Sequence, residues 1–140
     1  MIKYTDDDSS KGQTDMEKSF PSAYITEKGE KALRGGHPWV FSDEVTEVRG
    51  GYSNGDLVNV FSKKERYLGT GFINDFSKIR IRLISRNAND RFDDEFWKRR
   101  VRYAINYRKT VMLGEDFLCC RLIFGEADFF PGLTVDRFGD

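Results

Sequence analysis

The sequence predicts a mixed α/β chain that is mainly β, in which a small β-barrel is followed by a long helix and a β-hairpin. Three observations predict this fold. Residues 55–85 alternate apolar and polar side chains as half-buried strands do, residues 94–112 repeat apolar side chains at helical spacing, and residues 120–138 hold two further strand patterns around a Pro-Gly turn. A lone hairpin is marginal in water, so we expect the last one to begin an α+β domain that is truncated in this chain.

A short strand and a short helix are expected before the barrel's central strands. Residues 23–26 form the strand, and Thr26 can cap a helix that continues through Leu33. The glycine pair at 35–36 ends this helix, and the proline that follows prevents its return. The next elements expected are a buried anchor at 39–41 (Trp-Val-Phe), a turn at 42–44 and a strand at 45–49.

The central strands form a predicted meander of three segments, 57–61, 67–74 and 78–85. Two glycines at spacing two in the middle segment would let that strand bend, as a small barrel requires. In the last segment the alternation places Arg80 and Arg82 on the face opposite its isoleucines.

A long basic helix is expected after the meander. Asp93 is a good N-cap, and Phe92 before it could form a hydrophobic staple with Trp97. The helical spacing places four basic residues on the outer faces of this helix: Lys98, Arg99, Arg100 and Arg102. They could form an ordinary solvated surface or a surface that contacts RNA.

Charge is balanced overall but uneven along the chain. The sequence has 23 Lys and Arg against 23 Asp and Glu, yet residues 63–102 contain 12 basic and 6 acidic residues. This segment could form an anion-binding face or an ordinary solvated one. The adjacent Cys119 and Cys120 cannot form an ordinary bridge and, with one histidine in the chain, fall short of a zinc site, so we expect no metal and a reducing cytoplasm. Residues 1–19 lack the apolar segment of a signal peptide, and no segment is apolar enough to span a membrane.

Residues that could carry chemistry each have a simpler structural interpretation. His37 could bind a phosphate or be a packed turn residue, and no nucleophile lies near it in sequence. Three acidic residues could serve as an acid/base set, but turn hydrogen bonds or pairing with Arg121 and Arg137 explain them better; they are Glu126, Asp128 and Asp136. Three aromatic residues could stack RNA bases or belong to the core; they are Tyr67, Phe72 and Phe76.

Several motifs carry a resemblance to a known family. Before and within the meander they are Gly36-His37-Pro38-Trp39-Val40-Phe41, Gly55-Asp56-x-Val58-x-Val60, Gly69-x-Gly71-x-x-Asn74 and Ser77-x-Ile79-x-x-Arg82-Leu83. This part of the chain resembles a PUA domain. The hairpin segment, Arg121-Leu122-Ile123-x-Gly125-Glu126-x-Asp128-x-x-Pro131-Gly132-Leu133-x-Val135-Asp136-x-Phe138, resembles the start of the central domain of large-subunit ribosomal-RNA cytosine-C5 methyltransferases.

Residues 1–20 are expected to be a disordered tail, because they contain almost nothing to bury. The resemblance implies a division of the rest, with 21–88 the PUA-like RNA-binding domain, 89–114 a linker helix and 115–140 the start of a truncated strand-strand-helix-strand-strand domain. The family transfers a methyl group from S-adenosylmethionine (SAM) to RNA, and its catalytic and cofactor motifs lie in a further domain. We therefore expect no catalytic residue and no bound cofactor in this fragment, with SAM implied for a full-length protein.

The resemblance also places the RNA site beside the first helix and the following strand, which here are Lys28, Gly29, Lys31, Arg34, Gly35, Gly36 and His37. We add Arg80 and Arg82 from the polar face of their strand, because they would extend the positive surface. The expected partner is structured RNA, ribosomal RNA in particular. The alternative function is a protein-interaction or dimerisation module without RNA binding, which the zero net charge and an exposed hairpin edge would fit.

Overall fold

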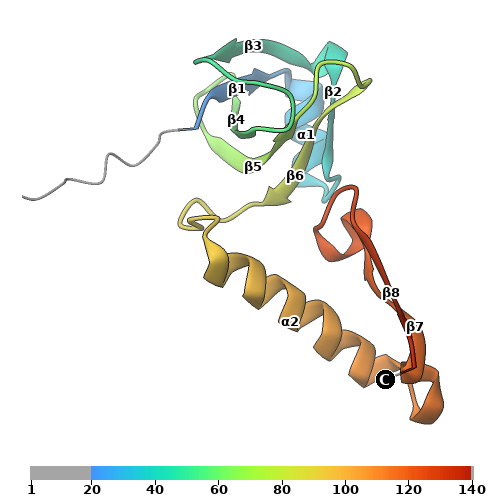
Figure 1. Cartoon of the computed structure of the whole chain (residues 1–140). Helices are drawn as coiled ribbons and strands as arrows, with labels where there is room; N and C mark the ends of the chain where they lie inside the picture. Colours follow the sequence, from blue (N-terminus) through green and yellow to red (C-terminus); the bar gives the residue numbers. More distant parts are fainter. Residues whose placement is uncertain (1–19, 140) are drawn as a thin grey trace, which may run out of the picture.

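The computed structural model describes residues 20–139, which form a curled sheet followed by a long helix and a hairpin (Figure 1). The disordered tail expected at 1–20 lies, except for its last residue, outside the described residues. The elements are β1 Ser22–Ile25, α1 Glu27–Arg34, β2 Trp39–Phe41, the 3-10 turn η1 Ser42–Glu44, β3 Val45–Arg49, β4 Leu57–Ser62, β5 Tyr67–Ile73, β6 Ile79–Ser85, α2 Asp94–Val111, η2 Gly114–Leu118, β7 Cys119–Phe124, η3 Gly125–Asp128 and β8 Thr134–Phe138.

The larger sheet has six strands in the order β2-β6-β5-β4-β1-β3. The predicted meander is confirmed as β4, β5 and β6, which pair antiparallel in sequence order, while β1 runs parallel to β4 and antiparallel to β3. The sheet curls as a half-barrel. Its two edges, β2 and β3, follow one another through η1, and no ladder pairs them within the described residues. The predicted barrel is therefore confirmed only as a curled sheet.

The core fills the inside of this curled sheet. Its buried side chains come from β1, α1, β2, β4, β5 and β6; they are Ala23, Ile25, Leu33, Val40, Val58, Val60, Leu68, Ile73, Ile81 and Leu83. The bend in β5 depends on Gly71, because a Cβ there would lie 2.3 Å from the carbonyl oxygen of Arg82. The β5–β6 register also shifts between Thr70 and Gly71, as expected where a glycine lets two backbones approach closely.

The anchor expected at residues 39–41 is buried at one position only. Val40 is fully buried, whereas Trp39 and Phe41 are partly exposed. The expectation fails here because β2 is an edge strand, and alternate side chains of a strand point to opposite faces of the sheet. Two large aromatic rings therefore lie on the outside, beside the end of α1.

Helix α2 begins as the sequence indicates, but its aromatic contacts differ from the expectation. Asp93 caps the helix, since its Oδ1 accepts a hydrogen bond from the Phe96 amide at 2.9 Å. Phe92 packs on Phe96, with ring centroids 4.9 Å apart, instead of on Trp97. Trp97 instead stacks on Phe72 of β5, because it lies on the side of α2 that faces the curled sheet.

The hairpin β7–β8 packs along α2, as Figure 1 shows. A second, small core lies between them and contains Ala104, Ile123 and Phe130, with Trp97, Val101 and Val135 packed around it. Cys119 is exposed and Cys120 partly buried on β7, and both are free thiols.

Candidate nucleic-acid interface

The C-terminal end of α1 forms an ordered turn that exposes backbone and basic side chains. Thr26 caps the start of α1 by accepting a hydrogen bond from the Gly29 amide at 3.3 Å. At the other end, the Gly36 amide donates to the Leu33 carbonyl at 3.0 Å and the His37 amide donates to the Ala32 carbonyl at 3.1 Å. This is the Schellman pattern, and Gly36 supplies its required left-handed backbone with φ +98°.

Three basic side chains of α1 are exposed: Lys31 and Arg34 in its last turn, and Lys28 in its first turn. The Lys28 Nζ lies 3.6 Å from Glu44 Oε1 and 3.8 Å from Asp43 Oδ2, and Arg34 donates to Glu30 Oε1 at 2.9 Å. Within residues 20–139 Lys31 makes no ion pair. Glu44 is buried, but the cations of these pairs are themselves more than half exposed, so an incoming phosphate could compete for them.

Gly29 is a packing position and not part of the exposed surface. It is buried, and a Cβ there would lie 3.3 Å from both the Glu44 Cβ and the Ile25 Cδ1. Its small size lets α1 approach η1 closely, which sets where Lys28 lies.

His37 is exposed on the turn and packs edge-on to Trp39, with ring centroids 5.5 Å apart. Its Nδ1 accepts a hydrogen bond from the Trp39 amide at 3.3 Å, and its ring is tilted toward Phe41 at 6.1 Å. Among the described residues it has no carboxylate partner and no nucleophile beside it. These contacts match the packed-turn interpretation of His37, while its exposure leaves it available to a ligand.

Arg86 is a residue of this region that the sequence did not indicate. Its guanidinium donates to the carbonyl oxygens of Leu33 and His37, the latter at 3.0 Å, and so holds both ends of the turn after α1. It also adds a positive charge at the C-terminal end of the helix, where the helix dipole favours a cation. Arg86 is 49 residues from His37 in the chain, so no local pattern could pair them.

Arg80 and Arg82 lie on β6, next to β2, but their guanidinium groups contact other parts of the protein. Arg80 donates to Asp75 Oδ1 at 2.8 Å and to the Tyr52 hydroxyl at 3.0 Å. Burial acts to lower the pKa of Arg80, but these two hydrogen bonds outweigh it and the pKa is raised. Arg82 pairs with Trp39 in the ladder, and its guanidinium lies 3.5 Å from Glu126 Oε1. Both charges are thus partly neutralised.

The other chemical candidates are accounted for by internal contacts. Asp136 pairs with Arg121 as expected, at 2.7 Å, and the Arg121 hydrogen bond lowers the pKa of Asp136. Arg137 instead donates to the Gly139 carbonyl at 2.7 Å. Asp128 pairs with Arg108 of α2 at 2.5 Å, an ion pair that the sequence did not indicate. No acid/base set forms among these described carboxylates, because each has its own arginine.

The sequence suggested that Arg100 lies on an outer face of α2, but in the structure it does not. It donates to the Ile84 carbonyl and, at 3.5 Å, to that of Phe129, and it lies over the rings of Phe96 and Phe129. Burial lowers the pKa of its guanidinium. Arg100 therefore joins β6, α2 and the hairpin instead of facing solvent.

Two features bear on whether the described residues could hold a metal or SAM. No group of three His, Cys, Asp or Glu side chains in residues 20–139 could hold a metal ion. A depression of about 340 Å³ lies between α2 and η3, but the carboxylate of Asp128 on its wall is already bonded to Arg108.

A comparison of the sequence with models of known protein families gives a match that covers the curled sheet and α1. Residues 23–86 match the family model described as "PUA-like domain". The matched residues are those of α1 and the curled sheet, so this part of the chain is PUA-like. The matched region contains all nine residues expected at the RNA site, from α1 to β6.

Curated relatives are similar along most of the chain. The chain is 32% identical over 121 residues to "Ribosomal RNA large subunit methyltransferase I" of Klebsiella pneumoniae, and 33% identical over 119 residues to the protein of that name from Aeromonas hydrophila. These alignments cover 86% and 85% of this chain but 30% of each relative. The chain thus spans less than a third of the length of these relatives.

Solved structures share the fold of this chain beyond the PUA-like domain. A putative SAM-dependent methyltransferase from Streptococcus mutans matches with a TM-score of 0.69 at 20% identity, over 84% of this chain and 30% of that one. A putative methyltransferase complexed with SAH matches equally well. Within the described residues, no helix is long and apolar enough to cross a membrane.

Proposed function

We propose that this chain is the RNA-binding N-terminal portion of a SAM-dependent ribosomal-RNA methyltransferase that modifies carbon 5 of cytosine. The proposal rests on one observation above all: similarity to the named methyltransferases covers 121 of the chain's 140 residues, well beyond the PUA-like match at residues 23–86. The PUA-like domain at 21–88 would hold structured RNA, the helix at 89–114 would link it, and 115–140 would begin a further domain. The catalytic residues, SAM and the cytosine specificity would belong to parts of such a protein outside this chain, and its compartment would be the cytoplasm.

The proposed RNA surface is centred on the turn after α1. Lys28, Lys31 and Arg34 would contact phosphates, and the exposed backbone at Gly35 and Gly36 would allow a close approach. His37 would add a further contact, and Arg86 would hold the turn in place. Arg80 and Arg82 would contribute less, because each already faces a carboxylate.

The test is binding of a labelled ribosomal-RNA stem-loop, followed by fluorescence anisotropy at several salt concentrations. Affinity should fall as salt rises, because phosphate contacts release counterions. In the triple variant Lys28→Gln/Lys31→Gln/Arg34→Gln, the slope of log affinity against log salt should decrease by roughly one for each phosphate that is no longer neutralised.

A matched control removes equal charge at another place. Lys63, Lys64 and Arg66 are exposed in the β4–β5 turn, and replacing these three with Gln should leave the slope near its original value. Equal losses of affinity in both triple variants would indicate nonspecific attraction and would argue against a site at α1. Absence of binding by the unaltered chain at low salt would reject the RNA-binding function.

A second candidate function, protein contact, is favoured by the surface of the hairpin region. Large apolar side chains are exposed there; they are Leu113, Leu118, Phe124, Leu133 and Phe138. The strand edges of the two-stranded sheet are also unpaired within the described residues. Sedimentation velocity distinguishes this function, since a homodimer would show a mass that rises with protein concentration without RNA.

A further inference from the structure

Three aromatic residues of the meander could stack RNA bases, and the structure separates them clearly. Tyr67 packs edge-on to Phe61, and its hydroxyl lies 2.7 Å from the Thr70 Oγ1. Phe72 is covered by the ring of Trp97. Phe76 is 93% exposed, the highest exposure among the large apolar side chains of residues 20–139. Of the three, Phe76 therefore offers a ring face to a partner.

The turn that presents Phe76 is held by hydrogen bonds close to the ring. The side-chain oxygen of Asn74 accepts from the Phe76 amide at 2.9 Å, and that of Asn54, from the β3–β4 loop, accepts from the Asp75 amide at 2.8 Å. At the start of β6, Ser77 Oγ accepts from the Ile79 amide at 3.2 Å. The backbone on both sides of Phe76 is thus fixed.

A network of side-chain hydrogen bonds also holds the same turn. The Tyr52 hydroxyl donates to Asp75 at 3.0 Å, and Arg80 donates both to Asp75 at 2.8 Å and to Tyr52 at 3.0 Å. This triangle joins the β3–β4 loop, the turn and β6. The backbone that carries the ring is therefore held before binding, so a ligand would not have to immobilise the loop.

The turn lies beside η1, the element that Lys28 of the proposed RNA surface contacts. The Ser42 amide donates to the carbonyl of Lys78 at 2.9 Å, and Phe41 of β2 pairs with Ile79. Figure 1 shows the β5–β6 turn next to β2. Lys78, next to the turn, is exposed and could meet a phosphate of a nucleotide whose base lies on Phe76.

We propose that Phe76 is a stacking residue of the RNA site, where its ring packs against an unpaired base of the bound RNA. This inference rests on the proposed RNA-binding function. Base stacking suits an exposed ring, because every base has an apolar face, and the cation at Lys78 complements the adjoining phosphate. It also explains why a turn so thoroughly bonded presents an apolar side chain to water.

The test measures anisotropy of a fluorescein-labelled ribosomal-RNA stem-loop with unpaired loop bases. Phe76→Ala should weaken binding about 5- to 100-fold, the range typical of losing one base–aromatic stack. The salt slope should stay unchanged, because no phosphate contact is removed. Phe76→Trp should bind at least as well as the original chain, and Phe76→Leu, which is apolar but cannot stack, should bind nearly as weakly as Phe76→Ala.

The matched control is Phe138→Ala, which removes an 80% exposed ring from β8, at the other end of the molecule. It should bind RNA normally, and all variants should keep the original melting temperature. If the original chain binds RNA and Phe76→Ala binds equally well, the stacking role is wrong while RNA binding stands. If Phe76→Leu binds normally, the contact is apolar but not stacking, and the inference is also wrong. If the original chain binds no RNA, the underlying function fails.

Discussion

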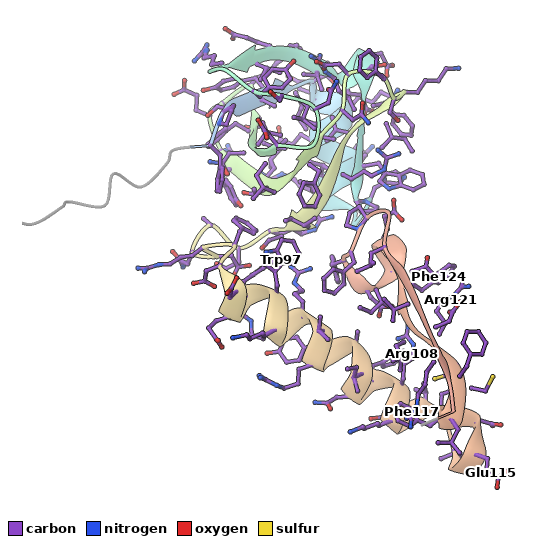
Figure 2. All side chains as sticks on the ribbon, in the orientation of Figure 1. Trp97, Arg108, Glu115, Phe117, Arg121 and Phe124 are labelled. Atoms are coloured by element: carbon purple, nitrogen blue, oxygen red, sulfur yellow. The ribbon has the colours of Figure 1, made fainter. Side chains whose placement is uncertain are left out.

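Trp97 of α2 stacks on Phe72 of β5, with ring centroids 6.4 Å apart and ring planes only 10° apart. The Trp97 ring also packs against Phe130 of the hairpin, with ring centroids 5.8 Å apart. This one side chain of α2 (Figure 2) therefore contacts both the curled sheet and the hairpin region. Two arginines add further contacts at this junction. Arg100 donates to the Ile84 carbonyl, and Arg82 pairs with Glu126. The PUA-like domain and the hairpin are therefore held in one orientation.

The first prediction concerns this junction. Trp97→Ala should lower the free energy of unfolding by about 2–4 kcal/mol, at or below the usual cost for a core aromatic because the ring is partly exposed. Chemical denaturation measures the loss. Tyr103→Ala on the exposed side of α2 is the control and should change stability by less than about 0.5 kcal/mol. Equal stability of both variants would mean that the stack does not hold the two parts together.

The second prediction concerns Arg86. Arg86→Ala removes two hydrogen bonds to the turn after α1, so amide hydrogen exchange at Gly36 and His37 should become faster while the meander stays protected. Arg86→Lys should restore this protection only in part, since one ammonium group lacks the planar fork that reaches both carbonyls. Unchanged exchange in Arg86→Ala would show that the Schellman turn is stable without it.

The third prediction compares two glycines. Gly71→Ala should destabilise the protein by about 3 kcal/mol or more, because its Cβ would overlap backbone atoms of Arg82 at 2.3 and 2.7 Å. Gly36→Ala should cost only about 1–2 kcal/mol, since nothing lies within 4 Å and the cost comes from φ +98° alone. Thermal and urea unfolding measure both, and the reverse order of stabilities would contradict the close approach of β5 and β6.

The fourth prediction concerns the buried pair Arg108–Asp128, which lies between α2 and the hairpin (Figure 2). Arg108 also donates to the Arg121 carbonyl at 2.9 Å, and Asp128 accepts from the Phe124 amide at 2.8 Å. Arg108→Ala should destabilise the hairpin by about 3–5 kcal/mol, because a buried carboxylate loses its partner.

Hydrogen exchange measures that change and its location. Even in the original protein we expect slower exchange in β4–β6 than in β7–β8, and Arg108→Ala should speed up exchange in the hairpin alone. Lys109→Ala, which removes an exposed cation next in the helix, is the control. Equally fast exchange in the meander of Arg108→Ala would mean that the two sheets unfold as one unit.

The fifth prediction concerns pH. The hydrogen bond from Arg121 lowers the pKa of Asp136, so the folded carboxyl should titrate below the ordinary value of about 3.9. The pair therefore contributes to stability above that pH, and its contribution is lost as the pH falls through the lowered folded pKa. NMR titration of the Asp136 carboxyl carbon checks this. Arg121→Gln should move the midpoint upward, and an unmoved midpoint would contradict the pairing.

Local patterns predicted the elements well. Thr26 and Asp93 cap the helices as expected, the glycine pair at 35–36 ends α1, and the three meander strands lie within a residue or two of their predicted bounds. These features depend on neighbours in the chain, which is why sequence alone could indicate them. The grouping of residues around the turn after α1 as an RNA site came instead from the family resemblance, and it stays a prediction.

Partners across the fold could not be predicted in this way. Trp97 was expected to meet Phe92 but stacks on Phe72, Arg100 was expected in solvent but bonds to Ile84, and Arg86 contacts His37 from 49 residues away. Long arginine and tryptophan side chains bind wherever a carbonyl, a carboxylate or a ring comes within reach, and only the packing of distant segments brings those groups there. The sequence by itself therefore determined the strands, the helix caps and the basic turn. The tertiary structure decided which cations stay exposed and which of the three candidate stacking rings, Phe76, faces solvent.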